Sequence, residues 1–403
     1  MNNITLLKKL VYQGAKEKDL KLTDTVLRRL SHEFSVIENI NAVDYFILSA
    51  RIIAICSNSW ILRKPCIGSS GGSLVNYCLD ITNINPIEYD LIFERFLNSD
   101  TIRQPVFNIE INEAIYKEII LTRIMEFYPE YNIYSIGFKP KNKKKFKKFT
   151  YGDEVYYKHP YAFIITTDSI ENSTAIYDDK KIYFTNDLEN DPVCSKRIYL
   201  TYEEEYLMNL KNVEYKISEE YDTNDIPLND KKVFEFLTTS GKTENTFIFG
   251  YSDMISPLEC FKPQNINDLA ILDTTCRPGA AKLMSEVIVN RNYDYDKFDN
   301  QLINDLLEET YGVLIYQETF LKILYSIGGM SYDDAELWRK KLFRAKSDEF
   351  PILINKLFDG FDRERNDLSQ NDFDRLKEMV ISNLKVTFIK AHSLSLSIIS
   401  YWG

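Results

Sequence analysis

The chain has 403 residues, of which 44% are hydrophobic and 27% are charged, and its formal net charge is −11. This length and composition are enough for two or three folded domains with buried cores. A protein that holds a DNA duplex usually presents a basic surface, because neutralised phosphates supply most of the non-specific affinity, so the acidic balance argues against tight duplex binding. No apolar run approaches the roughly 20 residues that span a bilayer, and no signal-peptide pattern opens the sequence, so we expect a cytoplasmic protein.

The six cysteines are scattered along the chain and form no C-x-x-C pair. Only three histidines accompany them, so the sequence favours neither a zinc site nor a disulfide framework. We expect free thiols in a reducing compartment.

Residues 1–62 are predicted to be a helical N-terminal segment, because their apolar residues recur near the 3.6-residue period. Thr23 is suited to the N-cap of one helix. The strongly apolar stretch 43–55 predicts a buried helix. We expect its Tyr45 and Phe46 to be core residues rather than base-stacking residues.

Residues 68–73 read Gly-Ser-Ser-Gly-Gly-Ser, and an apolar run at helical spacing follows from Leu74. Small residues leave the backbone N–H groups uncovered, so such a turn can surround an anion. The N-terminus of a following helix would add a partial positive charge. On its own this turn is more often a plain loop, and the phosphate-binding hypothesis depends on its flanks.

Residues 105–111 alternate between apolar and polar types, which predicts a half-buried strand with Asn108 and Glu110 on one face. A helix is expected over 114–128, followed by strands over 131–138 and 161–166. The lysine-rich stretch 139–148 separates those two strands. We interpret it as a solvated loop in preference to a nucleic-acid contact, although aromatic residues interleave with its lysines.

From residue 228 onward, helical periodicity dominates. The predicted helices cover 230–237, 267–272, 302–309, 317–327 and 333–344. Ser331 is suited to the N-cap of the last of these, with carboxylates in the first turn. The pattern as a whole indicates an α+β chain.

Several segments, in order along the chain, resemble the palm and fingers of the bacterial DNA polymerase III α subunit, a C-family DNA polymerase. The segments are 68–98, 226–234, 276–279, 309–318 and 388–401. The resemblance implies a polymerase β-like nucleotidyltransferase palm, a mixed sheet with helices, over 63–227. It also implies a helical fingers-like domain over 228–403, both following the helical segment 1–62.

Carried over position by position, the resemblance places a phosphate cradle at Gly68 and Ser69 and the three metal-binding aspartates at Asn108, Glu110 and Glu214. Phosphoryl transfer there would use Mg²⁺ or Mn²⁺. Glu110 and Glu214 keep a carboxylate, one methylene longer than the family's aspartates. Asn108 brings no charge. Either the site works with a weaker or single metal, or it binds nucleotide without efficient turnover.

The resemblance also implies triphosphate contacts from basic side chains. They are Arg277, Arg339, Lys340, Arg344, Lys346, Lys390 and His392. Lys340 and Arg344 share one face of a predicted helix. Lys390 and His392 match a Lys-x-His motif beside the incoming nucleotide. The alternative for Lys340 and Arg344 is a solvated helix face. The alternative for His392 is a buried core histidine.

Between Asn108 and the segment 159–165, which resembles the family's return to the palm, only about fifty residues remain. The family places its thumb there, so we expect a nearly deleted thumb. We also expect no N-terminal metal-hydrolase domain and no clamp-binding, helix-hairpin-helix or oligonucleotide-binding parts. Such a chain would hold nucleoside triphosphates, with little or no binding of duplex DNA and no membrane contact.

Two functions follow, and we favour the first. It is a nucleotidyltransferase that joins nucleoside or deoxynucleoside triphosphates into a short oligonucleotide without a template, for instance a nucleotide signal in antiviral defence, with a protein partner encoded nearby. The alternative is a catalytically degenerate protein that senses nucleotides or imitates the replicase. A DNA-templated polymerase is the least favoured reading, because it needs tight, salt-sensitive binding of duplex DNA.

Overall fold

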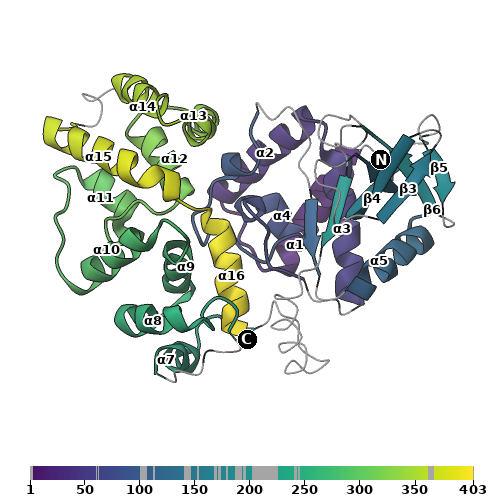
Figure 1. The fold of residues 1–403 in the computed structure, drawn as a ribbon, viewed down its shortest axis with the longest axis horizontal. Coiled ribbons are helices and arrows are strands. Elements are labelled where there is room, and N and C mark those ends of the chain that lie inside the picture. Colours follow the sequence, from purple (N-terminus) through teal and green to yellow (C-terminus); the bar gives the residue numbers. More distant parts are fainter. Residues whose placement is uncertain are drawn as a thin grey trace. The chain divides into compact units, whose positions relative to one another are not determined.

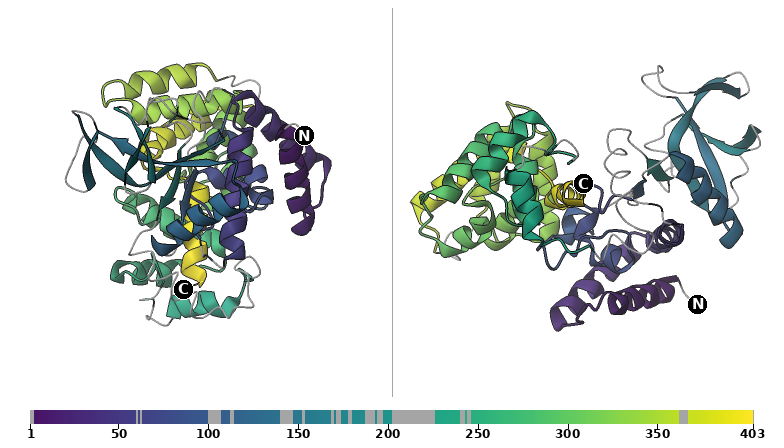
Figure 2. Two further views of the ribbon diagram at one scale, coloured as in Figure 1. Left: turned by 90° about the vertical axis from the view of Figure 1, so that its right-hand side faces the viewer. Right: turned by 90° about the horizontal axis from the view of Figure 1, so that it is seen from below.

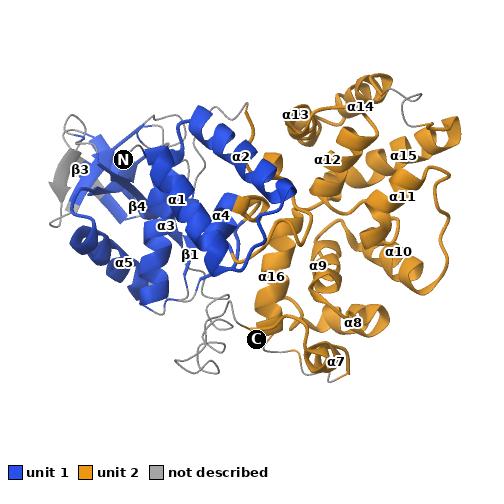
Figure 3. Cartoon of the chain, turned by 180° about the vertical axis from the view of Figure 1, so that it is seen from behind, with its two compact units in different colours: residues 1–67, 75–82, 101–214 blue, residues 68–74, 83–100, 215–403 orange. Residues whose placement is uncertain are grey.

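Helices and one sheet make up the computed structural model (Figure 1, Figure 2). It describes residues 3–59, 61, 63–99, 107–111, 114–139, 147–151, 154–167, 170, 174–177, 180–186, 193, 197–201, 226–239, 243, 246–361 and 367–402. The chain divides into two compact units (Figure 3). Unit 1 holds residues 1–67, 75–82 and 101–214, and unit 2 holds residues 68–74, 83–100 and 215–403.

Unit 1 begins with helices at the predicted places. They are α1 (Asn3–Glu17), α2 (Asp24–Asn39) and α3 (Val43–Asn58), followed by the short α4 (Leu74–Cys78). Thr23 caps α2, because its hydroxyl accepts a hydrogen bond from the Val26 N–H. Tyr45 and Phe46 of α3 are buried against the ring of Phe107, at centroid distances of 4.5 and 5.6 Å. Their prediction as core residues is confirmed.

Within the described part of unit 1, the sheet has seven strands and mixed polarity. The strands are β1 (Phe107–Glu110), β2 (Asn132–Phe138), β3 (Lys147–Tyr151), β4 (Glu154–Thr166), β5 (Thr174–Tyr177), β6 (Lys180–Phe184) and β7 (Arg197–Thr201). Their order is β1-β7-β4-β2-β6-β5, with β3 paired to β4. The β1–β7 and β2–β6 pairs are parallel and the others antiparallel. Helix α5 (Ala114–Phe127) lies along the sheet, with Lys117 over the ring of Phe163.

Unit 2 is helical. Its α-helices are α7 (Lys231–Thr239), α8 (Ile255–Phe261), α9 (Ile266–Thr275), α10 (Ala281–Asn292), α11 (Gln301–Leu307), α12 (Gln317–Ser326), α13 (Tyr332–Arg344), α14 (Phe350–Asp359), α15 (Gln370–Asn383) and α16 (Lys390–Trp402). Short 3-10 turns join them: η1 (Ser70–Gly72), η2 (Phe93–Arg95), η5 (Ser252–Met254), η6 (Glu308–Thr310) and η8 (Leu384–Val386). Helix α16 packs on α9 (Figure 1), where the hydroxyls of Thr274 and Ser393 lie 2.8 Å apart.

The prediction of an α+β chain, with a mixed sheet between helical segments, is confirmed. All five predicted C-terminal helices are present, and Ser331 caps α13 by accepting a hydrogen bond from the Asp334 N–H. In the predicted loop 139–148, residues 147 and 148 instead open strand β3, and residues 140–146 lie outside the described residues. Among the described residues no single helix is long and apolar enough to cross a membrane, although the bent pair α2 and α3 passes by length and composition alone.

Candidate functional site

The glycine-serine turn belongs to unit 2, and two of its glycines are required by the backbone. Gly68 has a φ of +58°, a left-handed conformation that costs other residues energy. A Cβ on Gly72 would lie 2.5 Å from the carbonyl oxygen of Ile92. The backbone of the turn therefore depends on small residues, as the sequence predicted.

The turn is held against the start of α16 by His392. The Gly68 N–H donates to Nδ1 of His392 at 3.3 Å, and η1 packs on α16. Because Nδ1 accepts, this contact is made by an imidazole that carries no proton on Nδ1. The structure thus brings together two residues that were predicted from opposite ends of the chain.

Arg277 reaches the same part of unit 2 through Phe388. Its guanidinium carbon lies 3.6 Å from the centroid of the Phe388 ring, and that ring lies 5.5 Å from the ring of His392. Nη2 of Arg277 donates to both carboxylate oxygens of Asp273 at 3.1 Å. Its Nε–H is buried, with no hydrogen-bond partner among the described residues. We call Gly68, Arg277, Phe388 and His392 the turn cluster.

A buried donor without an acceptor costs free energy, so the Nε–H of Arg277 favours an incoming acceptor. The neighbouring thiol of Cys276 offers no anion, because burial, and next the charge of Asp273, raise its pKa to about 12. The turn cluster therefore presents a guanidinium with one donor left for an acceptor, and guanidinium groups bind phosphate oxygens.

Lys390 lies two residues before His392 but is committed to the scaffold. Its side chain is 4% exposed, and Nζ donates to the Glu309 carboxylate and to the Tyr89 carbonyl, both at 2.7 Å. Its own N–H donates to the carboxylate of Glu318 at 2.9 Å, which starts α16. In this arrangement the ammonium of Lys390 joins helices rather than facing an open site.

Helix α13 carries the other predicted cations, in two environments. Arg339 is buried and makes a two-pronged ion pair with Glu336, at 2.6 and 2.8 Å. Lys340 and Arg344 line an open groove of about 630 Å³, with Leu337 among its apolar walls, and Nζ of Lys340 also lies 3.6 Å from Glu336. The remaining predicted cation, Lys346, follows α13 and is exposed.

Arg95 of η2 is a basic residue that the sequence did not mark. It donates to the side chain of Gln317 at 2.7 and 3.0 Å and lies 3.8 Å from Glu336. Burial, and next the charge of Arg339, lower its pKa from the ordinary value. Arg95, Arg339 and Lys340 therefore share one buried glutamate, with Nζ of Lys340 at 3.6 Å. The sequence feature that could have marked Arg95 is its position inside the segment 68–98, which resembles the polymerase family.

The predicted carboxylate strand is β1, in unit 1. Asn108 lies on this strand, and its side-chain oxygen accepts a hydrogen bond of 2.6 Å from the Thr201 hydroxyl on β7. Glu110, at the end of β1, pairs in register with Thr201 and is 7% exposed. The third predicted position, Glu214, lies outside the described residues. The strand prediction is confirmed for the first two residues.

Lys64 is the residue that sequence reasoning missed at this strand. Its Nζ lies 3.3 Å from the carboxylate of Glu110, and its N–H donates to the Glu110 carbonyl at 3.0 Å. The side chains are 7% and 9% exposed, so the ion pair is buried. The sequence feature that could have marked Lys64 is the basic pair Arg63 and Lys64, shortly before the uncharged turn at residues 68–73.

A magnesium site needs several oxygen ligands, usually with more than one carboxylate for two ions. Here the charge of Glu110 is balanced by Lys64, and the Asn108 oxygen is neutral and accepts from Thr201. Within the described ranges, no group of three or more His, Cys, Asp and Glu side chains could hold a metal. These side chains do not fit a two-metal centre, so no step of a reaction is assigned to a metal here.

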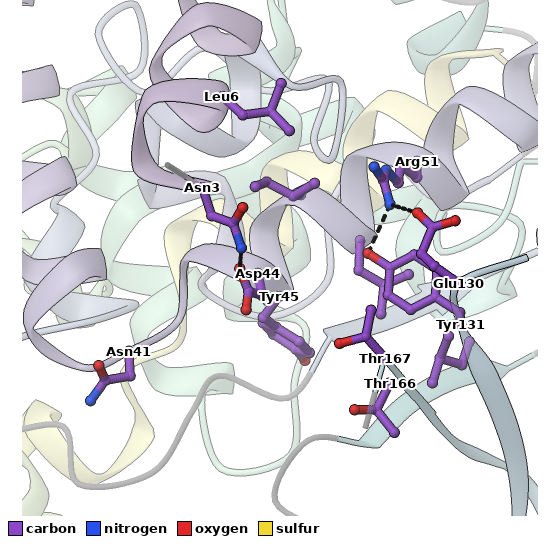
Figure 4. A pocket seen from close by; sticks show the side chains of 13 residues that line it. Asn3, Leu6, Asn41, Asp44, Tyr45, Arg51, Glu130, Tyr131, Thr166 and Thr167 are labelled. Carbon is purple, nitrogen blue, oxygen red and sulfur yellow. Dashed lines mark hydrogen bonds and ion pairs between the residues drawn. The ribbon is translucent and has the colours of Figure 1, made fainter. Parts of the chain in front are cut away.

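Unit 1 also has a polar pocket of about 520 Å³ between its helices and β4 (Figure 4). Arg51 lines it and donates to Glu130 at 2.8 Å and to the hydroxyl of Tyr131 at 3.0 Å. Burial is the main cause that raises the pKa of Tyr131. None of the predicted site residues is among those lining this pocket.

Two family models match the chain. The "Bacterial DNA polymerase III alpha NTPase domain" matches residues 5–148, which include the turn and β1, and the "Bacterial DNA polymerase III alpha subunit finger domain" matches residues 206–365.

Curated relatives agree with these matches. The chain is 27% identical to the DNA polymerase III subunit alpha of Ureaplasma parvum, over 98% of this chain and 47% of the relative. The subunits of Staphylococcus epidermidis and Staphylococcus aureus (strain Mu50) are 23% and 25% identical, each over 95% of this chain and 42% of the relative. The chain thus spans somewhat less than half the length of these relatives.

Proposed function

Because this chain belongs to the bacterial DNA polymerase III α family, a family of nucleotidyltransferases, we propose that it binds nucleoside triphosphates at the turn cluster of unit 2. The observation that carries the proposal is the buried Nε–H of Arg277, which has no hydrogen-bond partner among the described residues. The guanidinium of Arg277 stacks on Phe388, beside the Gly68 turn. A phosphate oxygen would satisfy that donor, while Nη2 of the same guanidinium stays bound to Asp273. The proposed ligand is a ribo- or deoxyribonucleoside triphosphate.

We further propose binding without efficient phosphoryl transfer. The support is the strand β1, where the two described positions of the family's metal-binding set are an asparagine and a glutamate paired with Lys64. In this proposal the chain senses nucleotides or imitates a replicase toward a protein partner. Its net charge of −11 supports little binding of duplex DNA.

The domain division is part of the same proposal. Residues 63–227 would form the palm-like domain with a reduced thumb, and 228–403 the fingers-like domain, after the helical segment 1–62. The cations Arg339, Lys340, Arg344, Lys346 and Lys390 remain proposed family positions. The contacts of Lys340 and Arg344 suit an anion better than those of Arg339 and Lys390, which are buried in ion pairs.

A second function is favoured by one observation, the Glu110 carboxylate at the end of β1, at the family's position. With Glu214 as a partner, and with Mg²⁺ or Mn²⁺ supplied, it would support template-independent joining of triphosphates into a short oligonucleotide. Such a product would serve as a nucleotide signal, for instance in antiviral defence. This function and the first differ in whether pyrophosphate is released.

Unfolding with and without nucleotide tests the binding proposal. ATP or dATP at a hundredfold excess over Kd should raise the free energy of unfolding by about 2.7 kcal/mol. Arg277→Gln should lose most of this stabilisation, whereas Arg123→Gln, which removes an exposed arginine of unit 1, should keep it. The absence of stabilisation by any triphosphate would contradict the proposal.

Mass spectrometry of the same mixtures separates the two functions. With mixed ribo- and deoxyribonucleoside triphosphates, Mg²⁺ and Mn²⁺, we expect intact triphosphates from both the wild type and Glu110→Gln. A new oligonucleotide mass that disappears in Glu110→Gln would establish the transferase instead.

A further inference from the structure

We infer that the ammonium group of Lys64 is the resident cation of Glu110, and that this carboxylate therefore does not take Mg²⁺ or Mn²⁺. The inference concerns unit 1 alone, and it deepens the proposed function by explaining why strand β1 would not support transfer. Its basis is the placement of Lys64 by the backbone, the burial of the ion pair and the charge balance at the end of β1.

The backbone holds Lys64 beside Glu110. Arg63 forms an antiparallel bridge with Ile111, and the Lys64 N–H donates to the Glu110 carbonyl at 3.0 Å. The segment before the turn therefore runs alongside the end of β1 as a short antiparallel partner. Main-chain hydrogen bonds fix the backbone of Lys64 at this place. The ammonium group therefore starts from a backbone position that is already beside Glu110.

The two side chains are also enclosed. Nζ lies 3.3 Å from Oε2 of Glu110, with exposures of 7% for Lys64 and 9% for Glu110. Separating a buried pair leaves an uncompensated charge out of water, which is strongly unfavourable. Lys64 therefore cannot swing away into solvent to make room for a metal without loss of stability.

Among the described residues, the charges of Glu110, Lys64 and Asn108 leave little to attract a dication. Glu110 and Lys64 sum to zero, and Asn108 adds none. A divalent ion brought to the carboxylate would meet an ammonium at close range, and the repulsion grows with the charge of the ion. Mg²⁺ also gives up its waters reluctantly and needs strong oxygen ligands in return.

Asn108 does not supply the negative charge that Lys64 neutralises at Glu110. Its side-chain oxygen already accepts a 2.6 Å hydrogen bond from Thr201 on the neighbouring strand. An aspartate at this position would add a negative charge on the strand of Glu110. We therefore attribute the loss of metal affinity at Glu110 to two residues together, the lysine at 64 and the amide at 108. Nucleotide bound by this chain receives no divalent ion from Glu110.

Mn²⁺ titration of the full chain without nucleotide, followed by the electron paramagnetic resonance of free Mn²⁺, tests the inference. The wild type should show no Glu110-dependent site with a Kd below about 1 mM. A tighter site that is lost in Glu110→Gln would overturn the inference. Because no nucleotide is present, this result is independent of whether the turn cluster binds triphosphates.

Two variants then test the role of Lys64 itself. The double variant Lys64→Met with Asn108→Asp should bind Mn²⁺ at least about tenfold more tightly than Asn108→Asp alone. Equal affinity of the two, with circular dichroism showing both folded, would contradict the role of Lys64. Should the double variant not fold, the comparison of wild type with Glu110→Gln still decides whether Glu110 takes a divalent ion.

Discussion

Lys64 and Lys390 are both buried lysines that contact a glutamate, at 3.3 Å in unit 1 and 2.7 Å in unit 2. The family resemblance marked Lys390 as a phosphate contact and did not mark Lys64. In the structure, Lys390 ties α16 to Glu309 and to a backbone carbonyl, whereas Lys64 neutralises the carboxylate at the predicted catalytic strand. A match to a family position identifies the type of residue, but the contacts of its side chain depend on the residues that pack around it.

The glutamates of the two pairs differ in solvent access. The side chain of Glu110 is 9% exposed, and that of Glu309 is 35% exposed. If its lysine is removed, Glu309 can be hydrated in part and Glu110 cannot. The difference predicts unequal stability losses, although each variant removes one buried ammonium.

The largest effect is expected for Lys64→Met. Leaving the buried Glu110 carboxylate without its cation should lower the free energy of unfolding by about 3 to 5 kcal/mol, measured by urea denaturation. The control is Lys139→Met, which breaks the exposed Lys139–Glu154 pair of the same unit and should have a much smaller effect, because water screens that pair. A loss for Lys64→Met no larger than that of the control would show that the buried pair is not formed in solution.

Lys390→Met should have a smaller effect, about 2 to 3 kcal/mol, because the partly exposed Glu309 regains water while the Tyr89 carbonyl loses a donor. The measurement is the same denaturation series. Lys340→Met is the control: it removes a half-exposed lysine that lies 3.6 Å from Glu336, which keeps its two-pronged pair with Arg339, and it should cost about 1 kcal/mol or less. A loss above that of Lys64→Met would reverse the comparison.

A smaller difference should separate two glycines of the turn. Gly72→Ala places a methyl 2.5 Å from the Ile92 carbonyl oxygen and should cost about 2 kcal/mol, because backbone must move. Gly68→Ala meets no atom within 4 Å and should cost about 1 kcal/mol, for its left-handed backbone alone. Thermal unfolding of both variants gives the comparison, and a costlier Gly68→Ala would show that the turn is not packed on Ile92.

Local signals predicted much of the fold. The N-cap residues Thr23 and Ser331 begin α2 and α13 where expected, and the apolar stretch 43–55 is the buried helix α3. The period of apolar residues is sufficient for such elements, because a helix closes its hydrogen bonds within one segment. Helices α8, α10, α14, α15 and α16 were not predicted, and neither were strands β3, β5, β6 and β7.

The sheet shows why part of the fold escaped prediction. Strand β1 pairs in parallel with β7, about 90 residues later, and β2 pairs with both β4 and β6. Partner and register in such pairs are chosen by packing between distant segments, so alternation within one strand does not reveal them. Asn108 and Glu110 were predicted to lie on β1, but the contact of Lys64 with Glu110 was not predicted.

By itself, the sequence determined the small-residue turn, the helix caps, the family and the residue types at the matched positions. Each of these depends on neighbours within a few residues or on a motif that can be read in order. Only the tertiary structure decided which charges meet. Lys64 and Glu110 are 46 positions apart, Lys390 and Glu309 are 81 apart, and Gly68 and His392 are 324 apart. An ion pair or hydrogen bond depends on distance and burial in space, and these arise when the chain has folded.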